Sequence, residues 1–138
     1  MIILDTNVIS EVFKPQPDPG VVAWLQGQAE DSVFTTAITR GELLFGANIL
    51  PPGRQRETLL AGLLRIFVVR FPGRVLPYDS DAADAHAAIA ALRRGQGRPI
   101  SQSDAMIAGI ARACGATLAT RNVRDFEGCG IPLVDPWH

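Results

Sequence analysis

The chain has 138 residues, of which 47% are hydrophobic and 20% are charged, so it can bury a packed core and we expect one domain over residues 1–138. The formal net charge is −1, which gives no bulk electrostatic sign of a nucleic-acid-binding protein, although all but one of the 13 basic residues are arginine. No apolar run is long enough to span a bilayer, and an acidic residue at position 5 interrupts the first one. We therefore expect no signal peptide, no membrane segment and a cytoplasmic location.

The first half of the sequence predicts strands and helices in alternation. Short runs of β-branched and other apolar residues indicate strands, and apolar residues three and four positions apart indicate helices. The expected elements are a buried strand at 2–5, a helix at 6–13, a short amphipathic helix at 21–29, a strand at 32–36, and helices at 37–50 and 54–71. The prolines of KPQPDPG and of PPG end the helices that precede them.

The second half continues the same alternation. The expected elements are a connecting segment or weak strand at 74–79, helices at 80–94 and 101–115, and strands at 116–120 and 131–135. Pro77 argues against a central strand at 74–79, because proline cannot donate a hydrogen bond to a neighbouring strand. Strands that alternate with helices over short connections predict a parallel sheet with helices on both of its faces.

Three acidic residues are expected where the carboxyl ends of the strands open into loops. Asp5 ends the first buried strand, and Asp104 heads the apolar stripe of its helix. Glu42 lies at helical spacing from Ile38 and Phe45, which predicts that it shares a face with these two apolar side chains. We therefore expect all three carboxylates to point toward the core at one edge of the sheet.

Each acid also has a structural interpretation. Asp5 is a suitable cap for the helix that follows it, and Asp104 completes the S-x-x-D pattern of a capping box. Glu42 has Arg40 and Arg121 as candidate ion-pair partners. The functional interpretation depends on whether the three acids converge.

Converging carboxylates require compensation for their charge. Two of them about 5 Å apart repel by roughly 3 kcal/mol at an effective dielectric of 20, so a cluster holds a proton, recruits arginine or binds a cation. Carboxylate oxygens suit Mg²⁺ or Mn²⁺. Zinc is disfavoured because histidine is scarce and the two cysteines, Cys114 and Cys129, lack the spacing of a metal knuckle. A carboxylate-bound Mg²⁺ activates water and neutralises charge on a phosphate oxygen, which suits phosphodiester hydrolysis.

Four ordered motifs give the sequence a resemblance to PIN-domain ribonucleases, specifically to VapC-type toxins and most of all to their FitB-like subgroup. The motifs are ILDTNVIS, TTAITRGELLFGA, ISQSDAMIAGIA and LATRNVRDFEGCGIPLVDPW, and the resemblance extends from Met1 to His138. It implies an α/β fold, namely a PIN-like three-layer α/β/α sandwich with a central parallel sheet of four or five strands.

The resemblance also implies a set of site residues. Asp5, Glu42 and Asp104 match the metal-binding acids of the family. Thr6 and Asn7 match the polar pair that follows the first acid and orients ligands or water.

The last motif departs from the family pattern. Asn122 stands where many relatives carry an acid, so it can orient water but adds no negative charge. Asp125, three residues later, either contributes to the site or only caps a turn. Arg121 and Arg124 lie close enough in sequence to be candidate contacts to RNA phosphates.

By resemblance, the chain is expected to be a Mg²⁺-dependent endoribonuclease toxin, with Mn²⁺ as the alternative ion. Its expected partners are RNA as substrate and a small cognate antitoxin that occludes the site. The resemblance further implies a homodimer, and binding to operator DNA only indirectly, through the antitoxin.

Two other functions are alternatives to a ribonuclease. A catalytically silent PIN-like scaffold would act only by binding an antitoxin or another partner, and intact Asp5, Glu42 and Asp104 count against it. An aspartyl-phosphate phosphatase needs a lysine near the phosphate, but the only lysine, Lys14, lies in a proline-rich loop, and Asn7 stands where a second aspartate is needed.

Two further segments leave alternatives open. The arginines of RRGQGR at 93–98 either grip the RNA backbone or form a solvated helix end, where cations complement the helix dipole. The helix segment LLAGLLRIFVV at 59–69 is apolar around most of its circumference, so it is either ordinary core or a dimer or antitoxin surface.

Overall fold

The sheet at the centre of the molecule has five parallel strands. The computed structural model describes all residues from Met1 to His138. The strands are β1 (Ile2–Leu4), β2 (Val33–Thr36), β3 (Val75–Leu76), β4 (Thr117–Ala119) and β5 (Leu133–Val134), in the spatial order β3-β2-β1-β4-β5. Every neighbouring pair is parallel, which confirms the predicted sheet at the upper end of its expected size.

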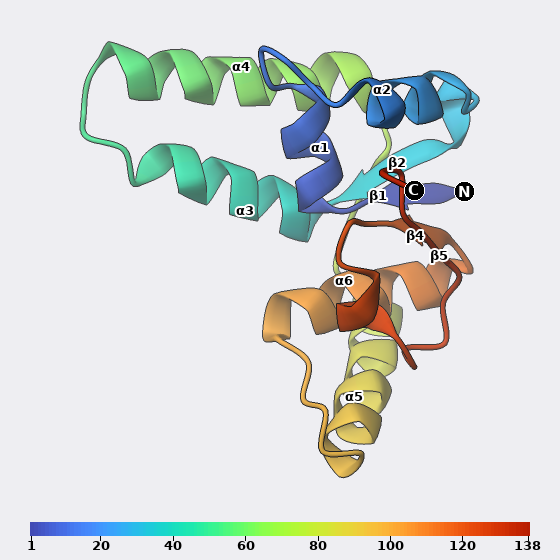
Figure 1. Ribbon diagram of the computed structural model, residues 1–138. Helices are drawn as coiled ribbons and strands as arrows, with labels where there is room; N and C mark the ends of the chain where they lie inside the picture. The colour runs from blue at the N-terminus through green and yellow to red at the C-terminus, as the bar shows by residue number, and fades with distance from the viewer.

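Six helices cover both faces of the sheet (Figure 1). They are α1 (Thr6–Val12), α2 (Pro19–Gln26), α3 (Ala37–Asn48), α4 (Arg54–Arg70), α5 (Ser80–Gly95) and α6 (Gln102–Cys114), together with the short 3₁₀ turns η1 (Glu30–Ser32) and η2 (Val123–Phe126). The first four helices pack on one face, and α5 and α6 pack on the other, which confirms the three-layer α/β/α sandwich. None of these helices combines the length and the apolar character needed to cross a membrane.

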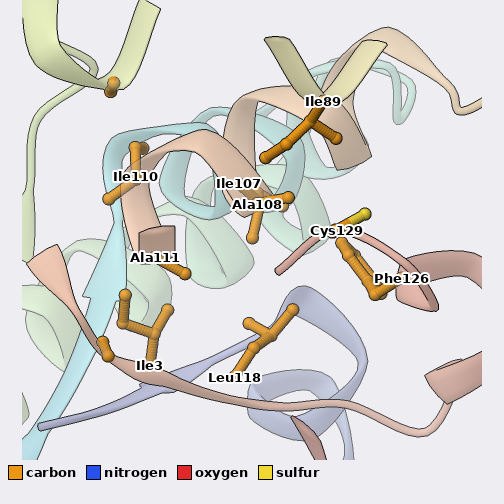
Figure 2. Close-up of a cluster of buried hydrophobic side chains, with 11 residues drawn as sticks. Ile3, Ile89, Ile107, Ala108, Ile110, Ala111, Leu118, Phe126 and Cys129 are labelled. Carbon is orange, nitrogen blue, oxygen red and sulfur yellow. The ribbon is translucent and has the colours of Figure 1, made fainter. Parts of the chain in front are cut away.

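The alternation of side chains along the strands divides the core into two halves. In β1, Ile3 points to the face covered by α5 and α6, and Leu4 points to the face covered by α1 to α4. In β4, Leu118 and Ala119 divide in the same way. Figure 2 shows the first half, where Ile3 and Leu118 of the sheet lie near Phe126 and the apolar side chains of α6. Because both faces are buried, β1 has the apolar sequence IIL with no alternating polar residue.

Element boundaries differ from the prediction by a few residues. Helix α2 begins at Pro19 because Asp18 caps it: Oδ1 of Asp18 accepts hydrogen bonds from the N–H groups of Gly20 at 2.8 Å and Val21 at 3.2 Å. The weak strand expected at 74–79 is β3, which has two residues and lies at an edge of the sheet.

Helices α5 and α6 are in close contact at a glycine. A Cβ atom on Gly109 would lie 2.5 Å from the carbonyl oxygen of Ala82 and 2.9 Å from the backbone nitrogen of His86, so only glycine allows this approach. The contact fixes α6, which carries Asp104 in its first turn, against α5.

Helices α3 and α4 project together beyond the sheet (Figure 1). Several of their large apolar side chains are exposed. The expectation that Phe45 marks a buried face of α3 is wrong, because Phe45 is 66% exposed and the buried residues of this helix are Thr39 and Ala47. Helix α4 buries only Leu63 and Phe67. The large exposed apolar side chains of the pair are Phe45, Ile49, Leu59, Leu64, Val68 and Val69. The segment at 59–69 is therefore only partly core.

Candidate active site

A cleft of about 380 Å³ opens beyond the carboxyl ends of β1 and β4. The chain runs outward from β1 to β3 and then returns to β4 on the other side of β1, so the loops after β1 and β4 diverge and leave a cleft between them. The lining residues are Asp5, Thr6, Asn7, Ser10, Glu11, Lys14, Glu42, Asp104, Arg121, Asn122 and Trp137. Asp5, Glu42 and Asp104, which come from three separate segments, thus line one cleft.

Asp5 is 5% exposed and is held by donors on both carboxylate oxygens. Oδ1 accepts a hydrogen bond from the backbone N–H of Thr6 at 2.8 Å, so Asp5 does cap α1. Oδ2 accepts from the hydroxyl of Thr120 at 2.8 Å and from the side-chain amide of Asn7 at 3.4 Å. Capping and cleft lining therefore coexist in this residue.

The charge on Asp5 is unfavourable where it lies. Burial raises the pKa of Asp5 above its ordinary value, and the hydrogen bonds from Thr120 and Thr6 only partly oppose this rise. The carboxylates of Glu42 and Asp125 raise the pKa of Asp5 further. No arginine or lysine forms an ion pair with it.

Glu42 reaches the cleft from α3, and it is exposed rather than turned toward the core as predicted. Oε1 of Glu42 accepts a hydrogen bond from the hydroxyl of Thr6 at 2.9 Å, and that hydroxyl lies 3.2 Å from the hydroxyl of the buried Thr39. Neither of the predicted ion-pair partners, Arg40 and Arg121, pairs with Glu42. The carboxylate is held in place but not neutralised.

Asp104 lies in the first turn of α6, which Ser101 caps. Oγ of Ser101 accepts a hydrogen bond from the backbone N–H of Asp104 at 3.2 Å, but no bond from the N–H of Ser101 to the Asp104 carboxylate completes a capping box. Burial raises the pKa of Asp104, and the charges of Asp5 and Asp125 add to the rise, while the Ser101 hydroxyl and the Arg93 guanidinium lower it. The carboxylate lines the cleft instead of closing the cap.

The chemistry of the cleft fits a hard divalent cation. Its donors are carboxylate, hydroxyl and amide oxygens, and neither histidine nor cysteine lines it. No three acidic, histidine or cysteine side chains are close enough together to form a ready-made ligand group. Because Mg²⁺ usually keeps several waters and takes only one or two carboxylates, this donor set fits Mg²⁺ or Mn²⁺ held in that way.

The segment after β4 divides into residues at the cleft and residues outside it. Asn122 lines the cleft, and its backbone N–H donates to Oγ1 of Thr120 at 3.1 Å. Arg124 and Asp125 are exposed and do not line the cleft, although the charge of Asp125 reaches both Asp5 and Asp104. Arg121 does line it, and its backbone N–H donates to Oδ1 of Asn7 at 3.2 Å.

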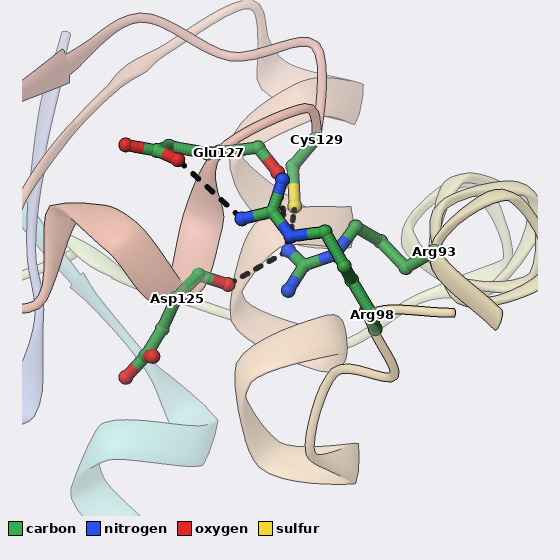
Figure 3. A network of polar contacts seen from close by, with 5 residues as sticks. All are labelled: Arg93, Arg98, Asp125, Glu127 and Cys129. Atoms are coloured by element: carbon green, nitrogen blue, oxygen red, sulfur yellow. Dashed lines mark hydrogen bonds and ion pairs between the residues drawn. The ribbon is translucent and has the colours of Figure 1, made fainter. Parts of the chain in front are cut away.

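Arg93 of α5 holds the segment after β4 in place through hydrogen bonds to its backbone. The side chain is 4% exposed, and its Nη1 donates to the carbonyl oxygens of Asp125 at 2.9 Å and Glu127 at 3.1 Å, while its Nε donates to that of Arg98 at 2.8 Å (Figure 3). The sulfur of the buried Cys129 lies 3.7 Å from Nη1. Of the predicted basic cluster at 93–98, Arg93 is therefore neither solvated nor available to RNA.

Three further residues of the site were not predicted as site residues. Thr120 is the hydroxyl donor to Asp5, and its place at the carboxyl end of a predicted strand was the available signal. Lys14 lines the cleft and pairs with the buried Glu11 at 3.2 Å, although its proline-rich loop had placed it outside the site. Trp137 comes from the last residues of the chain, which no local pattern connects with β1.

Comparisons with known proteins identify the family. Residues 2–128 match the model of the PIN domain. The chain belongs to the PIN-domain family. The resemblance that the four motifs carry is thereby confirmed, and the sheet order and layers are those of a PIN fold.

Similar proteins match this PIN domain over nearly their whole length. It is 39% identical over 137 residues to a VapC ribonuclease, Y4jK, of Sinorhizobium fredii, covering 99% of this chain and 98% of that protein. It is 38% identical over 138 residues to toxin FitB of Neisseria gonorrhoeae, covering 100% and 99%. The solved structure of FitAB bound to an IR36 DNA fragment is 36% identical and superimposes with a TM-score of 0.91, covering 100% of this chain and 96% of that one.

Proposed function

We propose that this PIN domain is a metal-dependent endoribonuclease and the toxin of a toxin–antitoxin pair. The observation that carries the proposal is that Asp5, Glu42 and Asp104 line one cleft with no cation paired to any of them. The names of its relatives, a VapC ribonuclease and a FitB toxin, support the same conclusion.

The ion that fits the donors is Mg²⁺, or Mn²⁺ in its place, held by one or two of Asp5, Glu42 and Asp104. When bound, such an ion lowers the pKa of water and neutralises the charge that develops on a phosphate oxygen. Hydrolysis of the phosphodiester then forms a bond from the water oxygen to phosphorus and breaks the bond to the leaving oxygen, which takes up a proton.

The remaining polar residues of the cleft position these acids and the substrate. Thr120 and the N–H of Thr6 fix the Asp5 carboxylate through one oxygen each, and the Thr6 hydroxyl fixes Glu42. Asn7 and Asn122 present amides at the cleft that can orient a water molecule. Preorganised groups of this kind favour hydrolysis because they need no rearrangement when the reaction occurs.

Cleavage of RNA with and without metal tests the function. We expect the wild-type chain to cut single-stranded RNA with Mg²⁺ or Mn²⁺, and we expect EDTA or Asp5→Asn to lower the rate by at least about 100-fold. Asp84→Asn, an exposed acid of α5 that does not line the cleft, is the control and should leave the rate unchanged.

Two outcomes would contradict the proposal. Cleavage that survives both EDTA and Asp5→Asn would come from a contaminant. No cleavage under any metal, from a folded wild-type chain, would favour the scaffold function instead.

The expected partners of the chain follow from its proposed function as a toxin. We infer a cognate antitoxin that occludes the cleft, a homodimer, and contact with operator DNA only through the antitoxin. The relative solved as FitAB on DNA supports this arrangement, and the uncovered apolar side chains of α3 and α4 offer a protein-binding surface. Size-exclusion chromatography with light scattering, of the chain alone and coexpressed with its neighbouring reading frame, tests both assemblies.

A further inference from the structure

Trp137 is the only hydrophobic residue that lines the acidic cleft. It is half-buried and packs along one edge of the core between the sheet and α1 to α4. Its backbone N–H donates to Oδ1 of Asp135 at 2.9 Å, which ties the chain end into a turn. Core packing accounts for the buried part of the ring, but the acids make no use of an indole at the cleft.

Arg121 lies on that ring. The guanidinium carbon is 5.0 Å from the centroid of the Trp137 indole, within the range of a cation–π contact. The chain has two ion pairs, Lys14 with Glu11 and Arg98 with Glu127, and Arg121 takes part in neither. Its side chain also makes no hydrogen bond to another protein group, although four carboxylates line the same cleft. The N–H groups of the Arg121 guanidinium are therefore free to bind a ligand.

We propose that Arg121 and Trp137 form a platform that binds one unpaired nucleobase of the RNA substrate beside the acids. This inference rests on the proposed ribonuclease function and extends it to the recognition of substrate. Arginine planes and indole rings are the side-chain surfaces on which single-stranded bases stack, and the edge of the same guanidinium can donate to a phosphate.

The charge of the cleft favours this mode of binding. Asp5, Glu11, Glu42 and Asp104 repel phosphate groups, and Lys14 is already paired. A base carries no net charge, so stacking gives the cleft an affinity for RNA that the acids do not weaken. A base inside a duplex cannot reach such a platform without being unstacked, so the substrate class is single-stranded RNA or a loop.

Binding measured in EDTA tests the platform without any cleavage. The chain has two tryptophans, so Trp24→Phe leaves Trp137 as the only indole. We expect hexa-adenylate to quench the fluorescence of this variant, and the same oligomer without bases to leave it unchanged. Trp137→Leu should weaken hexa-adenylate binding by about 5- to 150-fold, the range measured for loss of one stacking contact. Trp137→Phe should keep most of the affinity.

A second variant tests the platform without changing Trp137, whose substitution could unfold the chain. Arg121 is exposed, so Arg121→Gln should fold normally, weaken binding by several fold and lower the dependence of binding on salt by about one charge. Arg65→Gln, at an exposed position of α4 outside the cleft, is the matched control and should bind as the wild type does.

Kinetics then separate this proposal from the proposed function. With metal present, Trp137→Leu should raise KM and leave kcat within a few fold, because it removes binding rather than chemistry. Unchanged affinity and KM in both Trp137→Leu and Arg121→Gln would overturn the platform while leaving the nuclease intact. Base-dependent binding by a chain that cuts no RNA under any metal would overturn the nuclease and leave the platform standing.

Discussion

Asp5 in the acidic cleft and Arg93 behind it are both buried charges without an ion pair, but they differ in how the charge is satisfied. The guanidinium of Arg93 donates to three backbone carbonyls at 2.8–3.1 Å, all from segments that it holds in place. The acids of the cleft lie near one another, and burial raises the pKa of both Asp5 and Asp104.

We expect this difference between a charge that stabilises the fold and a charge that serves a function. A buried charge that its own chain satisfies contributes to the fold and needs nothing further. A group of like charges whose pKa values are raised, in an open cleft, is stabilised only when protons or a cation arrive. Four predictions test this contrast, from the largest expected effect to the smallest.

Removal of the Arg93 guanidinium should have the largest effect on stability. Arg93→Met leaves the carbonyls of Asp125, Glu127 and Arg98 without their donors, so we expect the free energy of unfolding to fall by about 2–4 kcal/mol. Arg94→Met, at the exposed neighbouring position, should change it by less than about 0.5 kcal/mol. Urea denaturation measures the free energy of unfolding of both variants. Equal effects would mean that the hydrogen bonds of Arg93 do not stabilise the fold.

A wider spacing between α5 and α6 should disturb both regions at once, because α5 carries Arg93 and α6 carries Asp104. Gly109→Ala forces its Cβ against Ala82 and His86, so we expect a loss of about 1–3 kcal/mol in unfolding free energy and a lower cleavage rate. Gly62→Ala, in α4 with open space around it, should instead stabilise by about 0.5–1 kcal/mol. A Gly109→Ala chain of wild-type stability would contradict the close contact.

Divalent ions should stabilise the folded chain through the cleft alone. At about ten times its Kd, a ligand of the native state adds about 1.4 kcal/mol, so Mg²⁺ or Mn²⁺ should raise the melting temperature by several degrees. The same ions should give no rise in the Asp5→Asn, Asp104→Asn double variant. Differential scanning fluorimetry with Ca²⁺ as a comparison ion measures both. An equal rise in the double variant would place the ion elsewhere.

Neutralising one acid of the cleft should stabilise the metal-free chain in a pH-dependent way. The folded-state pKa of Asp104 is raised above its ordinary value of 3.8, so its contribution to stability is fully present below that value and is lost as pH rises through the folded pKa. In EDTA at about pH 7.5, Asp104→Asn should therefore melt at a higher temperature than the wild type, with a gap that narrows toward about pH 4. Asp84→Asn serves as the exposed control. A gap that widens as pH falls would reverse the sign of the argument.

Local patterns predicted the strands, the helices and the three acids because each depends on neighbours in sequence. A continuous apolar run marked β1, and runs of β-branched, aromatic and small apolar residues marked β2 and β4. The position of Asp5 at the end of the first run placed it at the carboxyl edge of the sheet. The orientation of Glu42 was predicted less well. Helical spacing assigned a buried face to α3, but α3 projects beyond the sheet and leaves Phe45 and Glu42 exposed.

The residues that sequence analysis missed depend on contacts between distant segments. Lys14 lines the cleft because its ammonium group pairs with Glu11, although its backbone lies in the proline-rich loop. Trp137 lines the cleft because the chain turns back after β5. Arg93 has the sequence surroundings of a solvated helix end. It is buried because the segment from Asp125 to Cys129 folds over it.

The sequence by itself determined the order and type of the elements, the family and the identity of the three acids, because apolar periodicity and short motifs are properties of adjacent residues. The tertiary structure alone decided which charges share the cleft and which are satisfied inside the fold. The physical reason is that the free energy of a charge depends on its burial and on nearby dipoles and charges, and these come from parts of the chain that are far apart in sequence.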